Sequence, residues 1–450
     1  MKKIIIIVII FLCVCNQIYA KNILEDKTME KLINKERLQA NFIKYAKIDT
    51  GSDSVKAELQ IPSTDKQKNL AIVIAKDLEQ LGLKNVNIDK HYIVTADFPS
   101  NRENMPIIAL FAHMDTSSDV STGPVNPQIH NYTGGDIVLK NNIIIKSEDL
   151  KNEIGNKVIT SDGTTLLGAD DKAGIAEIIE AINVLIENPS IIRPEIKLVF
   201  TPDEETGMGT TVFDAENFNA DLAYTVDGSA PQELDTETFN AYNPEITITG
   251  KVVHCGYAYN KMINSLEVAN EFLSKLPKDE TPAKTKGRQG YYYIDEIKGT
   301  GERTIIKMLV RDFDYNQAKK RIDFLEKTLK EIEKKHNGVI IDFKPKMRYL
   351  NMKEKLQEFP EVITYAEEGI KRSGLNPKQN SVRGGTDGSA LTLRGLLTPN
   401  LGAGGENFHS QTEFVSVETM TKCCENILNI LSVWVEHSEE IMPKILERRK

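Results

Sequence analysis

Two periodicities of apolar residues alternate along the first half of the chain. Residues 68–83 and 172–188 carry apolar side chains at helical spacing, which predicts amphipathic helices. Residues 107–113 (IIALFAH) form a short continuous apolar run, as expected for a strand that is covered on both faces, and residues 195–205 and 221–227 are similar runs that end in acidic residues. The alternation predicts an α/β fold with a central sheet flanked by helices.

The pattern changes near residue 239. Strand-like segments at 245–253, 303–313 and 337–349 alternate with helical segments at 264–276 and 316–336. We therefore expect an inserted α+β domain over residues 239–351. The main domain would then be discontinuous, with a first part at 21–238 and a second part at 352–450.

The first twenty residues differ in composition from the rest. Lys2 and Lys3 precede an unbroken apolar run from Ile4 to Val14, which is typical of a secretory signal with cleavage after Ala20. The sequence thus predicts an exported protein, periplasmic or secreted. An uncleaved membrane anchor is the main alternative, although the run is short for a membrane-spanning helix.

Composition excludes some classes of partner. The chain has 450 residues, 40% hydrophobic and 27% charged, with a formal net charge of −9. This acidic balance argues against nucleic acid or an anionic membrane as the main partner. Three cysteines lie beyond the signal segment, and we expect Cys255, Cys423 and Cys424 to be free thiols.

Residues of the types that bind metals occur where the predicted strands and helices meet loops. Two imidazoles and three carboxylates suit a pair of zinc-like ions when one carboxylate bridges them. They are His113, Asp170, Glu205, Asp227 and His409.

Two acidic neighbours of these residues have a predicted catalytic role. Asp115 lies two residues after His113 and can hydrogen-bond its outer ring nitrogen. Glu204 is adjacent to Glu205, and a cation on Glu205 would leave Glu204 to act as the general base. Asp170 is favoured as the bridging carboxylate, with Asp171 at the start of the helix. For each motif taken alone, a helix cap or a solvated acidic turn is the simpler interpretation.

Seven segments, taken together and in this order, resemble the peptidase T group of tripeptide aminopeptidases in the M20 metallopeptidase family. They are HMDTSSD, GTTLLGADDKAGIAEI, TPDEETGMGT, AYTVDG, VRDFDYNQAKKR, VRGGTDGSALT and NFHSQTEF. The resemblance runs from about residue 30 to 440. It implies a zinc-peptidase-like catalytic domain with a mixed central sheet, an inserted lid domain, and release of the N-terminal residue from tripeptides.

The resemblance also assigns roles to individual residues. His113, Asp170 and Asp227 would hold one zinc ion, and Asp170, Glu205 and His409 would hold the other, with cobalt or manganese as possible substitutes. The lid would form a homodimer. His254 would stabilise the oxyanion, and the remaining expected substrate contacts are Arg311, Arg383 and Asn407.

Three features depart from this family pattern: Cys255 replaces the usual proline after His254, Ser410 replaces glycine after His409, and a signal-like segment precedes the enzyme. Because peptidase T enzymes are generally cytoplasmic, the resemblance leaves a cytoplasmic protein as the further alternative to export. Other substrates stay open, because a dipeptidase, a carboxypeptidase or an N-acyl amino acid deacylase would use the same metal chemistry. A non-catalytic peptide-binding protein is the alternative of another class, and the presence of Glu204 argues against it.

Overall fold

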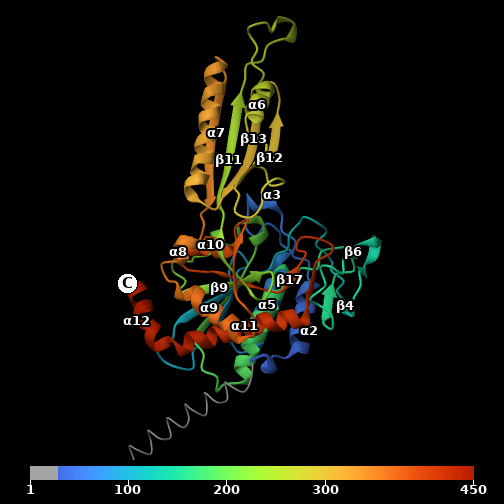
Figure 1. Ribbon diagram of the computed structural model, residues 1–450, viewed down its shortest axis with the longest axis vertical. Coiled ribbons are helices and arrows are strands. Elements are labelled where there is room, and N and C mark those ends of the chain that lie inside the picture. The colour runs from blue at the N-terminus through green and yellow to red at the C-terminus, as the bar shows by residue number, and fades with distance from the viewer. Residues whose placement is uncertain (1–28, 450) are drawn as a thin grey trace, which may run out of the picture. The chain divides into compact units, whose positions relative to one another are not determined.

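The computed structural model describes residues 29–449, so the predicted signal segment lies outside the described residues. The chain divides into two compact units (Figure 1). The first comprises the residues up to Leu234, Pro360–Lys378 and those from Pro399 onward, and the second comprises Asp235–Phe359 and Gln379–Thr398. The second unit thus includes residues 379–398, which we had expected in the main domain.

The first unit is built on a mixed sheet. Strands β8, β3 and β9 are parallel neighbours at its centre, β16 continues the parallel run, and β2 and β1 add antiparallel strands. The order is β1 (Lys84–Ile88), β2 (Val94–Phe98), β8 (Glu195–Thr201), β3 (Ile107–His113), β9 (Leu222–Gly228) and β16 (Asn400–Gly402). The expected apolar strands are therefore present, and β3 is buried from its second residue to its last.

Helices flank this sheet, as predicted. Helix α5 packs against β3 and β9, while α2 and α11 pack against α5. Because the sheet covers α5 on one side and these helices cover it on the other, α5 is buried continuously from Asp171 to Leu185, including Glu177 and Glu180. The prediction of an amphipathic helix here is therefore wrong. The helices of the first unit are α2 (Lys35–Ala46), α3 (Ser54–Ala57), α4 (Gln67–Gln80), α5 (Ala169–Glu187), α9 (Glu361–Arg372), α11 (Val417–Glu436) and α12 (Ser438–Arg448).

A smaller antiparallel sheet completes the first unit. It orders β17 (Gly405–Glu406), β18 (Phe414–Ser416), β7 (Lys157–Thr160) and β4 (Gln128–Asn131), beside a hairpin of β5 (Ile137–Val138) and β6 (Ile144–Ile145). Strands β17 and β18 bracket the loop that carries His409, so the pairing of β18 with β7 anchors one end of that loop.

The second unit has its own sheet and core. An antiparallel sheet in the order β12 (Tyr291–Gly299), β13 (Arg303–Asp312), β11 (Asn240–Thr249) and β14 (Ile340–Tyr349) carries α6 (Ser265–Ser274) and α7 (Tyr315–Lys335) (Figure 1). Its buried residues include Ile246, Phe272 and Ile306. Short helices α8 (Lys353–Leu356) and α10 (Asp387–Leu393) also belong to it. Two of the four unit boundaries fall within β10 (Glu233–Thr238) and β15 (Lys378–Val382).

Within residues 29–449, no helix combines the length and the apolar character needed to cross a membrane.

Candidate metal centre

The carboxyl ends of the central parallel strands bring most of the expected site residues together. His113 is the last residue of β3, Asp227 lies near the end of β9, and Glu204 and Glu205 follow β8 in a single 3-10 turn. Asp170 enters from the first turn of α5. Functional groups gather at this edge of α/β sheets because the strands end there side by side.

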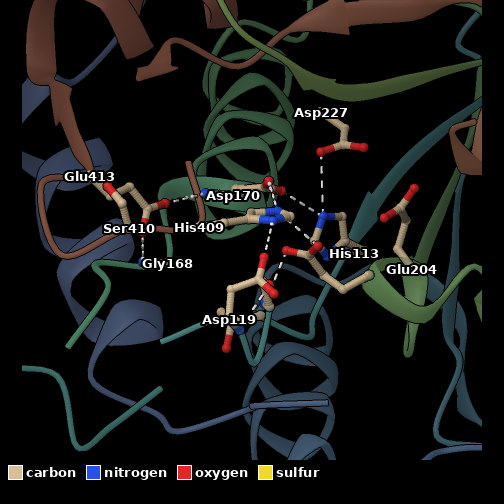
Figure 2. A network of polar contacts seen from close by, with 12 residues as sticks. His113, Asp119, Gly168, Asp170, Glu204, Asp227, His409, Ser410 and Glu413 are labelled. Atoms are coloured by element: carbon tan, nitrogen blue, oxygen red, sulfur yellow. Dashed lines mark hydrogen bonds and ion pairs between the residues drawn. The ribbon is translucent and has the colours of Figure 1, made fainter. Parts of the chain in front are cut away.

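Asp170 lies between the two imidazoles (Figure 2). Its Oδ1 is 2.7 Å from Nε2 of His113, and its Oδ2 is 3.4 Å from Nε2 of His409. Oδ1 of Asp227 is 3.4 Å from Nε2 of His113, and Oε2 of Glu205 is 2.8 Å from Nε2 of His409. Each oxygen of Asp170 thus faces a different histidine, and each histidine also faces a different further carboxylate, as expected for a bridging Asp170.

The chemistry of this donor set fits a pair of divalent cations. Burial, together with the neighbouring Asp170, raises the pKa of Glu205 to about 8 and that of Asp227 to about 7. Hydrogen bonds to Asp170 and Glu205 raise the pKa of His409 to about 11. Buried carboxylates that resist ionisation and imidazoles that hold a proton indicate an excess of negative charge that cations would neutralise. Imidazole nitrogen and carboxylate oxygen are ligands that zinc, cobalt and manganese accept.

Asp115 connects the first histidine to the acidic turn. It is fully buried, and its Oδ1 lies 3.3 Å from Nδ1 of His113, whose ring nitrogen is also 3.1 Å from the Asp115 carbonyl oxygen. The backbone N–H groups of Glu204 and Glu205 donate to the Asp115 carboxylate at 3.0 and 3.3 Å. One carboxylate therefore orients a ligand-type imidazole and also holds the turn that carries the predicted base.

The turn of Glu204 is also anchored from its other side. Asp203, which adopts a left-handed backbone conformation with φ of 55°, is buried and accepts hydrogen bonds from Ser63 and Gln67. The carbonyl of Asp203 accepts the N–H groups of Met208 and Gly209. Glu204 is therefore presented from a fixed turn (Figure 2).

Sequence reasoning missed Glu413. This carboxylate is 1% exposed and accepts the N–H groups of Leu167 and Gly168, both at 2.8 Å, and of Asp170 at 3.0 Å (Figure 2). Burial raises its pKa to about 7. It therefore holds the turn that presents Asp170. Its position inside NFHSQTEF, four residues after His409, was the available signal.

Sequence reasoning also assigned no role to Asp119 or Ser117, and it placed Asp171 only at the start of the helix. Oδ2 of Asp119 is 3.1 Å from Nδ1 of His409, and the Ser117 N–H donates to Oε1 of Glu205 at 3.0 Å. Oδ2 of Asp171 accepts the His113 N–H at 3.1 Å, so this residue does more than begin a helix.

The four predicted substrate contacts have other partners in the structure. Arg311 is 8% exposed and donates to the Tyr242 carbonyl at 2.8 Å. Arg383 donates to the carbonyls of residues 287 and 289 at 2.6 and 2.8 Å. Asn407 lies 3.3 Å from Asp149. Nδ1 of His254 accepts the N–H of residue 256 at 3.2 Å. Their substrate roles stay predictions.

Ser410 fits where glycine is usual. Its hydroxyl donates to the Asn407 carbonyl at 2.7 Å and lies 2.8 Å from the hydroxyl of Thr412. The side chain thus closes the His409 loop by internal hydrogen bonds.

The family model for peptidase family M20/M25/M40 matches residues 162–432. Peptidase T of Clostridium perfringens is 43% identical over 406 residues, which cover 89% of this chain and 100% of the relative. The fold is similar to that of the crystal structure of the aminopeptidase PepT from Bacillus cereus, with a TM-score of 0.71 and 23% identity over 90% of this chain and 100% of that one. It is also similar to a dinuclear metal-binding peptidase of the M20 family from Bacillus subtilis, with a TM-score of 0.62 and 14% identity over 89% and 98% of the chains.

These relatives contradict the predicted export. The peptidase T homologues are cytosolic enzymes, so the prediction of a periplasmic or secreted protein is wrong. The apolar run after Lys2 and Lys3 suggested export because it has the composition of a signal. Composition alone was not sufficient for that inference.

Proposed function

Since this chain belongs to peptidase family M20/M25/M40, we propose that it is a metal-dependent aminopeptidase that releases the N-terminal residue from tripeptides. The observation that carries the proposal is the position of Asp170, whose two oxygens face His113 and His409 separately. The peptidase T relatives, which align over their full length, support the substrate class.

In this proposal two zinc ions, with cobalt or manganese as substitutes, occupy the centre. His113, Asp170 and Asp227 would hold one, and Asp170, Glu205 and His409 would hold the other. When bound, such ions lower the pKa of a water molecule and polarise a peptide carbonyl.

Glu204 is the proposed general base. It takes a proton from the attacking water and delivers it to the amine that leaves when the peptide bond breaks. Asp115 acts as a positioning residue, because its carboxylate accepts the backbone N–H groups of both Glu204 and Glu205. It thereby holds the turn from which Glu204 acts as the base and Glu205 as a metal ligand. Glu413 has a similar function for Asp170.

His254 is proposed to stabilise the oxyanion, as the family resemblance implies, and the inserted domain is proposed to form a dimer interface. Nδ1 of His254 accepts a backbone N–H, so the neutral ring carries its proton on Nε2, the nitrogen that could donate to a developing oxyanion. The same hydrogen bond closes the turn in which Cys255 replaces proline. The homodimer is supported by the family resemblance, and sedimentation of the purified protein tests it.

The decisive experiment compares substrates before and after metal removal. The purified enzyme, treated with a chelator and then resupplied with zinc, is offered a free tripeptide, its N-acetylated form, a dipeptide and an N-acyl amino acid. We expect zinc-restored cleavage of the free tripeptide only, with release of its first residue. Preference for a blocked substrate would instead favour a deacylase or carboxypeptidase. Absence of any turnover by metal-loaded protein would favour a peptide-binding protein.

A paired substitution tests the base. Glu204→Gln should lower kcat by about 10²- to 10⁴-fold while metal stoichiometry is retained. Glu447→Gln, at an exposed position of α12, serves as the control and should leave kcat unchanged. Substantial activity in the Glu204→Gln enzyme would remove Glu204 from the mechanism.

A further inference from the structure

The two histidines of the centre are held in different ways. His113 is 2% exposed at the end of a buried strand, and its ring is fixed by packing and by Asp115. The His409 side chain is 39% exposed, and its backbone has a left-handed conformation with φ of 58°. The orientation of the His409 ring therefore depends on its polar contacts more than on packing.

The contact on the outer side of His409 comes from Asp119. Nδ1 of His409 lies 3.1 Å from Oδ2 of Asp119 (Figure 2). Nε2 of His409 faces Glu205 and Asp170. A ligand-type imidazole that donates its second N–H to a carboxylate has its tautomer and ring direction fixed, and becomes a more basic ligand. The Asp119 carboxylate occupies the position where this effect operates.

The segment of residues 117–119 also contacts Glu205, the ligand-type side chain that faces His409. The Ser117 N–H donates to Oε1 of Glu205 at 3.0 Å, which leaves Oε2 to face His409. The Asp119 N–H donates to the Ser117 hydroxyl at 3.3 Å, which ties the two ends of the segment together. Residues 117–119 therefore contact both Glu205 and His409.

We propose that Asp119 is a positioning residue that selectively sets the affinity of the ion held by Asp170, Glu205 and His409. The inference rests on the proposed two-ion centre and deepens it, because it gives one of the two ions a supporting carboxylate, Asp119, that the other ion lacks. The simpler alternative is a surface ion pair, since the Asp119 side chain is 68% exposed and such pairs contribute little to stability. A positioning role predicts that substitution of Asp119 changes the affinity for zinc, whereas a surface ion pair predicts no change in that affinity.

The test measures zinc binding by competition with a chromophoric chelator, together with thermal unfolding of the metal-free protein. Asp119→Ala should weaken one of two zinc equivalents by about 10- to 100-fold. Asp119→Asn should weaken it less, because the amide oxygen can still accept the imidazole N–H. Neither change should lower the Tm of the metal-free protein, because Asp119 is exposed.

Asp149→Asn is the matched control. Asp149 is an exposed carboxylate that contacts Asn407 of the same loop at 3.3 Å but not the histidine, so both zinc affinities should stay unchanged. If the Asp119→Ala protein binds both zinc equivalents as tightly as the wild type, this inference is refuted while the proposed two-ion centre stands. A lower Tm of the metal-free protein with unchanged zinc affinity would also refute it, in favour of a structural role. A wild-type protein that binds fewer than two ions would refute the two-ion centre and this inference with it.

Discussion

Replacement of Gly174 by alanine should push apart α5 and β9, two elements that carry residues of the metal centre. Gly174 lies in α5 where the helix crosses β9, and a Cβ there would stand 1.9 Å from the Val226 carbonyl oxygen and 2.5 Å from Oδ1 of Asp171. Contacts of a Cβ below 3.0 Å essentially do not occur, so the carbonyl before Asp227 would have to move by about 1 Å. Because the nearest obstacle, the Val226 carbonyl oxygen, is backbone, no side-chain rotation can relieve that contact.

The magnitude follows from two opposing effects. Alanine in place of glycine within a helix contributes about 1 kcal/mol of stability through helix propensity. Forcing a methyl group into a packed contact costs about 1–3 kcal/mol, and more when backbone must shift. We therefore expect a net loss of about 2 kcal/mol and, since a displacement of about 1 Å can cost 10²-fold in rate, a kcat lower by about that factor.

The assays are thermal unfolding of the metal-free protein and kcat for a tripeptide. Gly301→Ala is the control, because a Cβ there meets its nearest neighbour at 3.7 Å and should change neither quantity. A Gly174→Ala enzyme as stable and as active as the wild type would refute the argument, since it would mean that α5 and β9 can separate without moving the ligands.

Two further substitutions test the supporting structure. Burial alone would raise the pKa of Glu237, but hydrogen bonds from Arg288 and Ser381 lower it to about 2. Its contribution to stability is therefore present above the unfolded pKa near 4.5 and is lost as the pH falls toward 2. Glu237→Gln should cost about 2 kcal/mol in urea unfolding at pH 7 and progressively less below pH 4, and a cost independent of pH would contradict this. Trp434→Phe removes the N–H that donates to the Tyr224 hydroxyl at 2.9 Å, so the urea midpoint should fall by the equivalent of about 2 kcal/mol, whereas an unchanged midpoint would show that this buried hydrogen bond contributes nothing.

The parts of the centre that sequence could predict are those set by local pattern. His113 and Asp227 are placed by the ends of apolar strands, and such runs are visible in the sequence because strands covered on both faces carry almost no polar residues. The same kind of pattern predicts a strand at residues 303–313, where the structure has β13, whereas the neighbouring β12 is not predicted because most of its residues are partly or fully exposed.

The parts that could not be predicted depend on contacts between distant segments. Glu413 reaches the Asp170 turn across more than 240 residues, and its place in NFHSQTEF puts it near His409 but does not predict this contact. Glu180 belongs to the helix that the sequence predicts as amphipathic, but packing of α2 and α11 buries it, and Arg37 of α2 forms an ion pair with it. Packing of segments that are distant in the sequence therefore determines the environment of both carboxylates.

The ligand-type residues of the centre also have contacts outside their own set. Each of the five ligand-type side chains, or its backbone, has a hydrogen-bond partner from outside the set of five. These partners are Asp115 and Asp171 for His113, Glu413 for Asp170, Ser117 and Asp115 for Glu205, Asn400 for Asp227, and Asp119 for His409. In small zinc domains the ligands come together only when the metal binds, so metal binding and folding are one event. Here the sheet edge and these partners contact the ligand-type residues through protein groups, so we expect the first unit to fold before a metal binds.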